Sequence, residues 1–475
     1  MVLSLGLALL VPLAVSLLYA DGSWESFLIP AAVMVLVGGL GFRVTLPRSR
    51  RRLGYALPRD VLLSVTLAWV LAALLGGTPF LLDGVFSSPI DSTFEAMSGF
   101  TTTGATLLSE IEAQTPSILF WRSMTQWLGG IGIVVLFVAV APAIGFGAAR
   151  LISAEVSGIT QPRLTPRIAD TAKVLLTVYL TLSIAEVIAL LLAGMNLYDA
   201  VVHAFTTIAT GGFNPKTASV GFYDSVAIEM VLIVFMALSG VSFALYYIVY
   251  SRRSLRSLRD PELLTYLGIM VGSVLLVWGV LLVQGDYADW PTALRDSAFT
   301  VTSIITTTGY VTADFDRWDT VARTTLIVLM FVGGCAGSTA GGIKVVRVIV
   351  VFKTIVADLF RGIHPRAVTP LTLGDRLLSE ETRTAILGLV VAWLFIFALA
   401  TTLVASQEDL TPLTSASAVA ATLNVVGPGL GQVGASESYE VVNPFGRVVL
   451  SVCMLLGRLE ILTALALLSP AFWKR

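Results

Sequence analysis

Four short threonine- and glycine-rich stretches recur along the chain, each just before a long apolar segment typical of a helix. They read Thr101-Thr102-Thr103-Gly104, Ala209-Thr210-Gly211-Gly212, Thr306-Thr307-Thr308-Gly309 and Val425-Val426-Gly427-Pro428-Gly429. Aligned on Gly104, Gly211, Gly309 and Gly427, they lie 107, 98 and 118 residues apart, which leaves room for four copies of one helix–re-entrant loop–helix unit. Glycine lets backbone carbonyls turn inward without a clashing side chain. Since rings of inward carbonyls can replace the water around a cation, one chain with four such loops could close a ring by itself.

The composition indicates that these loops lie in a membrane. Of the 475 residues, 56% are hydrophobic and 13% are charged, whereas soluble domains carry about 25% charge. The apolar residues form runs of 18 or more rather than a stripe of helical period, which is typical of a polytopic membrane protein. The first run, 2–20, resembles the apolar part of a signal peptide, but it is too long and no Lys or Arg precedes it. We interpret it as a first transmembrane helix.

We predict an all-α membrane protein of ten spanning segments, with four pore hairpins around a central pore. The spans are 2–20 and 26–43, followed by the pairs 60–82 and 117–141, 171–194 and 226–250, 262–283 and 321–352, and 384–405 and 446–469. The predicted domains are an N-terminal helix pair, 1–45, and pore repeats 58–145, 168–253, 260–365 and 380–475. The stretch inside each pair is too short to cross, so it should enter the membrane and return. Non-helical backbone at that depth is tolerated only where it lines a watery cavity.

The basic residues predict the orientation. The links 43–59, 142–173, 251–260 and 343–383, together with the last two residues, hold 23 of the 30 Lys and Arg residues. The four loops with the glycine motifs hold three. Because cytoplasmic loops carry the excess of Lys and Arg, we expect the glycine loops to face outside and both termini to lie in the cytoplasm.

Few residues could support redox, metal or proton-transfer chemistry. Cys335 and Cys453 stand in apolar or glycine-rich surroundings and are predicted to be buried thiols rather than a disulfide. Two isolated histidines, His203 and His364, and scattered carboxylates form no evident metal site, proton relay or catalytic dyad. A membrane enzyme or respiratory subunit is therefore disfavoured, and we predict that the chain is not an enzyme.

The hairpins have the chemistry of a cation filter. In each, an apolar half-helix is expected to point its C-terminal end at the central cavity, where its partial negative charge favours a cation. The backbone that follows supplies carbonyls, and threonine hydroxyls add further oxygens. One Thr-Thr-Gly is weak evidence, but four at matching places favour a pore over ordinary tight turns, which need no repeat.

These loops resemble those of the Trk/Ktr/HKT superfamily of potassium transporters, and nearly the whole chain is similar to its bacterial TrkH-type members. The resemblance implies four helix–pore loop–helix repeats in a pseudo-fourfold array in the bacterial inner membrane, with K+ as the permeant ion and no organic cofactor. It places potassium at filter residues Thr102, Thr103, Gly104, Ala209, Thr210, Gly211, Thr307, Thr308, Gly309, Val425, Val426 and Gly427. Relatives with serine in place of Gly104 tend toward sodium, so Gly104 favours potassium. The fourth loop lacks threonine before its glycine, so the ring is not chemically fourfold.

A glycine-rich run interrupts the span 321–352. It reads Gly333-Gly334-Cys335-Ala336-Gly337-Ser338-Thr339-Ala340-Gly341-Gly342. Five glycines in ten residues cannot remain a continuous helix, and such a break must face protein or water. Close packing through small residues is one interpretation. TrkH-type proteins carry a nearly identical motif as an intramembrane gating loop, so the resemblance favours a gate beneath the filter, with Lys344 and Arg347 following at the inner interface.

Several charges lie in or near the spans. Arg458 in the last span would cost about 2.5–3.5 kcal/mol at the bilayer centre, so it should either pair with Glu460 or Glu186 or face the permeation path beneath the filter. Family members have an arginine in the second role, and we assign Arg458 to the gate. Glu95 could brace the first pore helix, and Asp314 and Asp316 could hydrogen-bond the backbone of the third filter loop. For each of the three, a solvated place in an outer loop remains equally open.

The inner basic residues form two clusters, Arg252, Arg253, Arg256 and Arg259, and Lys344, Arg347, Lys353, Arg361 and Arg366. Membrane lipids with anionic headgroups would account for them, as would a docking surface. The resemblance implies a TrkA-like nucleotide-binding ring as regulator, and a homodimer. The chain itself contains no nucleotide motif, and we expect no nucleic-acid partner.

Together these features predict potassium uptake through a four-loop filter, controlled by the glycine-rich gate. The alternative is a secondary transporter that couples K+ to H+ or Na+. Such transporters have broken helices in paired positions, and only one span is clearly broken in the sequence.

Overall fold

The computed structural model describes residues 1–49, 58–140, 168–285, 287, 289–367, 369–374 and 376–461. Over this part of the chain the architecture is helical, as predicted. The exception is a small hairpin in which β1 (Thr372–Leu373) pairs antiparallel with β2 (Arg376–Leu377), so that Thr372 lies opposite Leu377.

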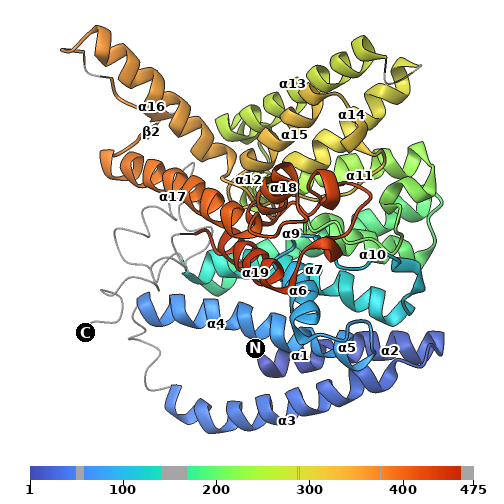
Figure 1. Ribbon diagram of the computed structural model, residues 1–475. Helices are drawn as coiled ribbons and strands as arrows, with labels where there is room; N and C mark the ends of the chain where they lie inside the picture. Colours follow the sequence, from blue (N-terminus) through green and yellow to red (C-terminus); the bar gives the residue numbers. More distant parts are fainter. Residues whose placement is uncertain are drawn as a thin grey trace.

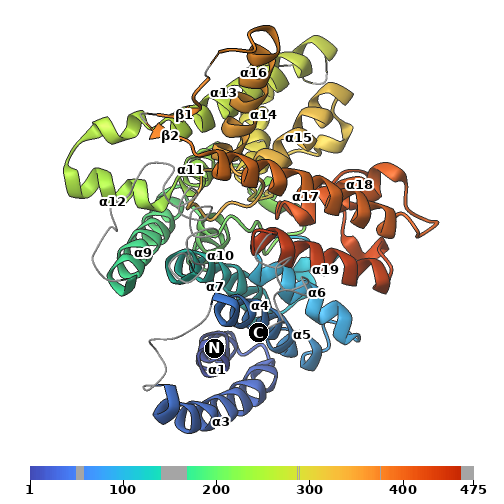
Figure 2. The same ribbon diagram turned by 90° about the vertical axis from the view of Figure 1, so that its left-hand side faces the viewer.

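The N-terminal helices form a pair at the periphery of the molecule (Figure 2). α1 (Val2–Ala8) and α2 (Leu10–Tyr19) together make one apolar span, and α3 (Trp24–Ser49) packs back against it. The two spans approach closely, because a side chain at Gly38 would collide with the backbone of Leu3. Small residues allow such approach in a membrane, where packing rather than hydrophobic burial drives helix association.

The remaining helices recur as four sets, each with a first span, a short pore helix and a second span. The sets are α4 (Pro58–Gly76) with α5 (Thr78–Leu82), α6 (Pro89–Phe100) and α7 (Pro116–Val140); α9 (Ile168–Leu192), α10 (Leu197–Ile208) and α11 (Val226–Ser239) with α12 (Phe243–Arg252); α13 (Pro261–Gln284), α14 (Trp290–Ile305) and α15 (Thr320–Val332) with α16 (Val345–Ile363); and α17 (Glu380–Val404), α18 (Pro412–Leu423) and α19 (Pro444–Arg458). Figures 1 and 2 show the four sets arranged around a common centre. The predicted four-repeat fold is thus observed.

Short 3-10 turns follow the pore helices on the way to the second spans. They are η1 (Ile111–Ala113), η2 (Ser219–Tyr223), η4 (Phe315–Arg317), and η5 (Gly431–Val433) with η6 (Tyr439–Val441). A further turn, η3 (Leu255–Arg259), links α12 to α13.

Each pore helix begins at a polar side chain that caps it. Ser88, Asn196, Asp289 and Thr411 accept hydrogen bonds from backbone N–H groups in the first turn of α6, α10, α14 and α18, respectively. Such caps satisfy donors that a helix leaves unpaired at its N-terminus. Most residues in the C-terminal halves of these helices are buried, so the helix ends meet inside the protein rather than in lipid.

Six predicted spans are long and apolar enough to cross a membrane. Two of them are helix pairs, α1–α2 and α4–α5, and the other four are single helices. A seventh, 226–250, is bent by 86° between α11 and α12. The prediction that only one span is clearly broken is therefore wrong. The sequence signal at this bend is weak, because Gly240 is the single glycine in the Gly240-Val241-Ser242 break.

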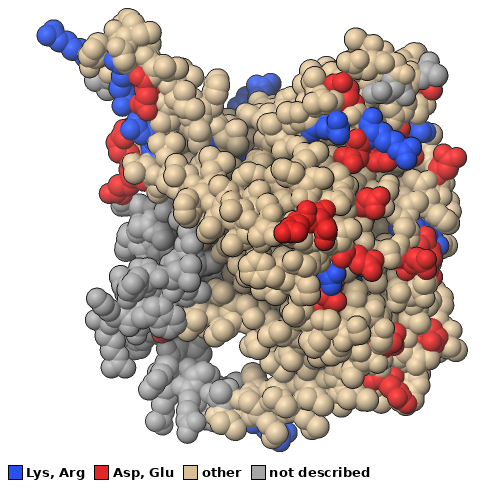
Figure 3. All heavy atoms as spheres, in the orientation of Figure 1, with Lys and Arg blue, Asp and Glu red and all other residues tan. Residues whose placement is uncertain are grey.

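The charged residues lie away from a broad uncharged band (Figure 3). In this view they gather toward the right-hand side and around the left-hand ends of α16 and α17. Many apolar side chains on the spans are exposed, such as Leu276 on α13 and Phe395 on α17. An exposed apolar surface of this kind is what a bilayer would cover.

Candidate functional site

The four loops after the pore helices have the same backbone conformation. Thr102, Thr210, Thr307 and Val425 all have φ between 55° and 61°, a region that L-residues seldom enter. Two residues later, Gly104, Gly212, Gly309 and Gly427 also have positive φ. Between them, the amides of Thr103, Gly211, Thr308 and Val426 donate to carbonyls five residues back, over 2.7–2.9 Å. The four-fold repeat predicted from sequence is thus present at the level of single backbone torsions.

This equivalence corrects the alignment of the second loop by one residue. The sequence pairing of Gly211 with Gly104 and Gly309 is wrong, because Gly212 has the matching torsion and Gly211 matches Thr103. Ala209 accordingly corresponds to Thr101, the residue that ends the pore helix. The equivalent triplets are Thr102-Thr103-Gly104, Thr210-Gly211-Gly212, Thr307-Thr308-Gly309 and Val425-Val426-Gly427.

The four loops close into a ring. A Cβ atom at Gly104 would lie less than 3.0 Å from the carbonyl oxygen of Gly211, and one at Gly212 equally close to that of Thr308. A Cβ at Gly309 would meet the carbonyl of Val426, and one at Gly427 the carbonyl of Thr103. The contacts therefore run from the first loop to the second, third and fourth and back to the first. This close approach, together with positive φ, is why each position requires glycine.

A buried ion pair supports the first two loops. The Glu95 carboxylate on α6 accepts from Arg122 Nε on α7 over 2.6 Å and from the Leu107 amide over 3.0 Å, and neither charged side chain is more than 2% exposed. Arg122 also donates to the Asn214 carbonyl, which follows the second of the four loops, over 3.1 Å. Of the two interpretations of Glu95, the bracing role is the one observed.

Gln126, one turn further along α7, holds the second loop directly. Its amide nitrogen donates to the Gly211 carbonyl over 2.7 Å, and its oxygen accepts from the Phe213 amide over 3.1 Å. Arg122 and Gln126 are not among the residues predicted from sequence. The available signal was their polarity within an apolar span, since such residues are rare there and usually face the protein interior.

Replacement of Arg122 by alanine is expected to destabilise the protein by about 3–5 kcal/mol, because it leaves the buried Glu95 charge without its partner. The loss would appear as a lower midpoint of thermal unfolding in detergent. Arg317→Ala is the matched control: its ion pair with Asp314 involves an arginine side chain that is 86% exposed, and exposed pairs contribute about 0–1 kcal/mol. Equal midpoints for the two variants would contradict this role of the buried pair.

Other polar side chains support the third and fourth loops. Ser303 donates to the Tyr310 carbonyl over 2.8 Å, and Tyr439 donates to the Gly427 carbonyl over 2.7 Å. Asp316 accepts from the Gly431 amide over 3.0 Å, so it braces the segment after the fourth loop rather than the third. Asp314 instead caps its own 3-10 turn and pairs with Arg317.

The glycine-rich run 333–342 lies directly beneath this ring. The Gly341 amide donates to the Thr307 hydroxyl over 2.7 Å, and a side chain at Gly341 would collide with the Asn424 carbonyl. The Thr339 hydroxyl donates to the Ile208 carbonyl, at the end of the second pore helix, over 2.9 Å. The run therefore contacts the inner ends of three loops and is not a plain helix–helix contact. Cys335 within it, and Cys453 on α19, are free and buried, as predicted.

Arg458 joins this run to the first repeat. Its guanidinium donates to the Thr339 carbonyl over 2.7 Å and to the Gly129 carbonyl of α7 over 3.5 Å. Within the described part of the chain it forms no ion pair, since Glu460 pairs with Arg347 over 2.6 Å. The predicted alternative of pairing with Glu460 or Glu186 is not observed.

Lys344 and Arg347 are 5% and 1% exposed, so their side chains are buried within the protein. The Lys344 ammonium donates to the Ala340 carbonyl, and Arg347 is held by Glu460. Both side chains are thus part of the structure beneath the ring and are not available to a docking partner.

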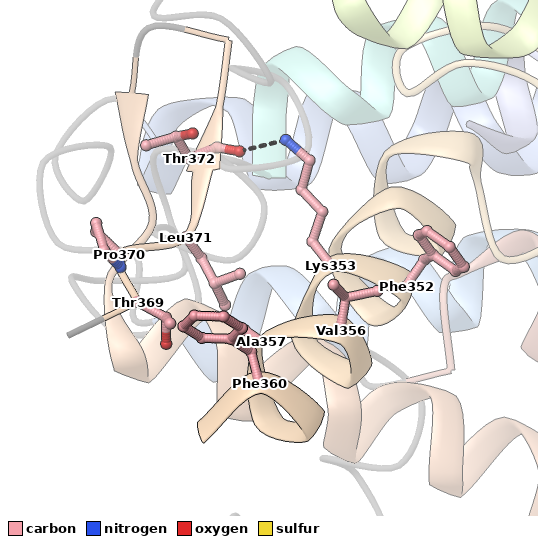
Figure 4. Close-up of a pocket in the computed structure, with 9 residues that line it drawn as sticks. All are labelled: Phe352, Lys353, Val356, Ala357, Phe360, Thr369, Pro370, Leu371 and Thr372. Atoms are coloured by element: carbon pink, nitrogen blue, oxygen red, sulfur yellow. Dashed lines mark hydrogen bonds between the residues drawn. The ribbon is translucent and has the colours of Figure 1, made fainter. Parts of the chain in front are cut away.

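A surface hollow lies elsewhere, between α16 and the hairpin of β1 and β2 (Figure 4). It is mainly apolar, with Phe352, Val356 and Phe360 on one side and Leu371 on the other, while Lys353 Nζ donates to the Thr372 carbonyl over 2.7 Å. None of its lining residues belongs to the loop ring or the run beneath it. The candidate site is therefore the axis of the ring.

Taken together, the fold and site define a class of membrane protein: a single chain whose four re-entrant loops surround one axis. The sequence profile of the TrkH family, described as a cation transport protein, matches residues 58–475. The chain is 39% identical over 473 residues to the Trk system potassium uptake protein TrkH of Halomonas elongata, covering 99% of this chain and 96% of that protein. It is 37% identical over 471 residues to TrkH of Escherichia coli K12, covering 98% and 96%.

The chain also resembles the crystal structure of the potassium transporter TrkH from Vibrio parahaemolyticus, with a TM-score of 0.90 and 36% identity over 100% of this chain and 97% of that one. This chain belongs to the TrkH family. The family is one of transport proteins, so the predictions of the family and of a chain that is not an enzyme are confirmed.

Proposed function

We propose that this protein takes up potassium by conducting it through the ring of four loops. The observation that carries the proposal is the closed order of contacts from Gly104 round to Gly427, in which each of the four loops lies against the next. Relatives named potassium uptake proteins share nearly the whole chain. Backbone carbonyls replace the hydration shell of K+ in filters of this kind, and 100 mV, inside negative, would supply about 2.3 kcal/mol per ion for entry.

The proposed potassium ligands are the carbonyl groups of the four equivalent triplets, with Gly212 taking the place of Ala209 in the second. The pore helices point their C-terminal ends at this ring, so their dipoles favour a cation there. The fourth triplet, Val425-Val426-Gly427, offers carbonyls but no hydroxyl.

Purified protein in liposomes is expected to take up rubidium, a potassium analogue, in preference to sodium. The measurement is isotope uptake against an opposing potassium gradient, with protein-free liposomes as the control. Equal uptake of sodium and rubidium would contradict a potassium filter, and no uptake of either by folded protein would contradict conduction.

The run 333–342 is the proposed gate. Its support is position: it contacts the inner side of the second, third and fourth repeats and, through Arg458, approaches the first. Conduction requires that it move aside. Five glycines give it the backbone freedom to do so.

The proposed regulator is a cytoplasmic nucleotide-binding ring of the TrkA type, which would act on the gate from the inner face. The exposed basic residues there are Arg253, Arg256 and Arg259 between α12 and α13, and Lys353 and Arg366 near α16. We place docking on this set, with lipid headgroups as its competitors. Rubidium uptake with and without a co-purified partner tests regulation by such a ring. We also propose a homodimer, which the mass of the particle in detergent would test.

Coupled transport of K+ with H+ or Na+ is the second candidate. The 86° bend between α11 and α12 favours it, because the second spans of two adjacent repeats are now both broken, as in many secondary transporters. Rubidium uptake driven by a proton or sodium gradient at zero membrane potential would identify coupling. Uptake that follows the membrane potential alone would identify a channel.

A further inference from the structure

The break between α11 and α12 and the break between α15 and α16 are joined by backbone hydrogen bonds. The Cys335 amide of the run 333–342 donates to the Gly240 carbonyl over 2.8 Å, and the Phe243 amide at the start of α12 donates to the Gly337 carbonyl over 3.0 Å. The breaks in the second and third repeats are therefore one connected structure. If either break moves relative to the other, these two hydrogen bonds must be broken.

A buried carboxylate holds the same run from the other side. Glu262, in the first turn of α13, is 8% exposed, and its Oε1 accepts from the Ala336 amide over 2.6 Å. The N-terminus of α13 is capped independently, because the Asp260 carboxylate accepts from the amides of Glu262 and Leu263. Glu262 is thus free to bind a loop that lies 74 residues further along the chain.

Glu262 suits this place because a carboxylate makes a stronger bond to an amide than a neutral acceptor does. Ala336 lies inside a segment without helical hydrogen bonds, so its buried N–H group depends on such a partner. Opening the run would separate the pair and expose both groups.

We propose that Glu262 is a positioning residue that holds the run 333–342 in its closed place beneath the filter. The proposal rests on the proposed function of this run as the gate. Release of the Ala336 amide would let the run leave the Thr307 hydroxyl and the end of the second pore helix. Glu262 would then set how readily the pore opens, without touching the ion.

The chain carries its own reporter for this movement. Cys335 is next to Ala336 and 2% exposed, and Cys453 is the chain's other cysteine. In a Cys453→Ala background, the rate at which a membrane-permeant maleimide labels Cys335 measures opening of the run. Rubidium uptake by the same protein in liposomes measures conduction.

Two variants distinguish a latch, meaning a Glu262 side chain that holds the run 333–342 closed, from a charge that only stabilises the N-terminus of α13. Glu262→Asp keeps the negative charge at the N-terminus of α13 but is one methylene shorter, so it should no longer reach Ala336. We expect it to raise the labelling rate about tenfold, the effect of losing roughly one charged hydrogen bond. Glu262→Gln retains the reach and a neutral acceptor, so it should give a smaller rise. If Glu262 served only to stabilise the helix dipole, Glu262→Asp would label at the rate of the parent and Glu262→Gln would label faster. That result would overturn the proposal.

Glu380→Gln is the matched control, since Glu380 also lies in the first turn of an inner helix, α17, but is 74% exposed and pairs with Arg383. It should label like the parent. Faster labelling of Glu262→Asp together with higher uptake supports both the latch and the gate. Faster labelling with unchanged uptake would leave the latch standing and show that the run is not the gate. Unchanged labelling in folded Glu262→Asp would overturn the latch.

Discussion

Replacement of Gly212 by alanine is expected to abolish rubidium uptake. The φ of +76° at this position already strains an L-residue, at about 1 kcal/mol. The added Cβ would also lie less than 3.0 Å from the Thr308 carbonyl oxygen, which is backbone and cannot rotate away as a side chain does. The ring contact between the second and third loops would therefore be forced apart. Uptake by the purified variant in liposomes, beside its unfolding midpoint, measures the effect.

Gly211→Ala tests the corrected alignment, because it alters the residue that sequence comparison alone paired with Gly104. Its φ is not positive, and its Cβ would press on the Gln126 side chain rather than on backbone. Uptake should fall less than in Gly212→Ala. Gly268→Ala on α13, where the added Cβ would meet no atom within 4 Å outside its own stretch of helix, should change nothing. A silent Gly212→Ala with a severe Gly211→Ala would restore the original alignment.

The four-repeat architecture could be predicted from sequence, because each repeat has two recognisable features, a long apolar run and a glycine motif. The register of the second loop could not. Gly211 and Gly212 are adjacent, and either can be aligned with Gly104 at nearly the same spacing. What separates them is the backbone torsion at Gly212 and its contact with Thr308, which depend on a neighbouring repeat.

The breaks in the spans show the same limit. Five glycines announce the run 333–342, since no helix tolerates them together. The bend at Gly240 has one glycine and is stabilised by bonds to Cys335 and Gly337, so its cause lies nearly 100 residues away along the chain. Likewise, the sequence marks Glu95 as a charge near a pore helix, but only the fold brings it to Arg122.

Replacement of Arg458 by alanine is expected to raise rubidium uptake about tenfold, for two reasons that act in the same direction. The guanidinium binds the Thr339 carbonyl, so its loss frees the run 333–342 on the side of the fourth repeat. It is also a buried positive charge beneath the ring of four loops, without an ion-pair partner among the described residues. At about 8 Å and an effective dielectric constant near 20, such a charge repels a passing cation by about 2 kcal/mol. Initial rates of uptake in liposomes measure the change.

Arg458→Lys distinguishes the two effects. Lysine keeps the charge but lacks the planar guanidinium group with which arginine donates to the Thr339 and Gly129 carbonyls at the same time. If repulsion dominates, the lysine variant should conduct like the parent, whereas if the bond to Thr339 dominates, its uptake should rise toward that of the alanine variant. The labelling rate of Cys335 would rise only in the second case, because repulsion of an ion does not move the run. Unchanged or lower uptake by folded Arg458→Ala would mean that the arginine neither closes the run nor opposes the ion.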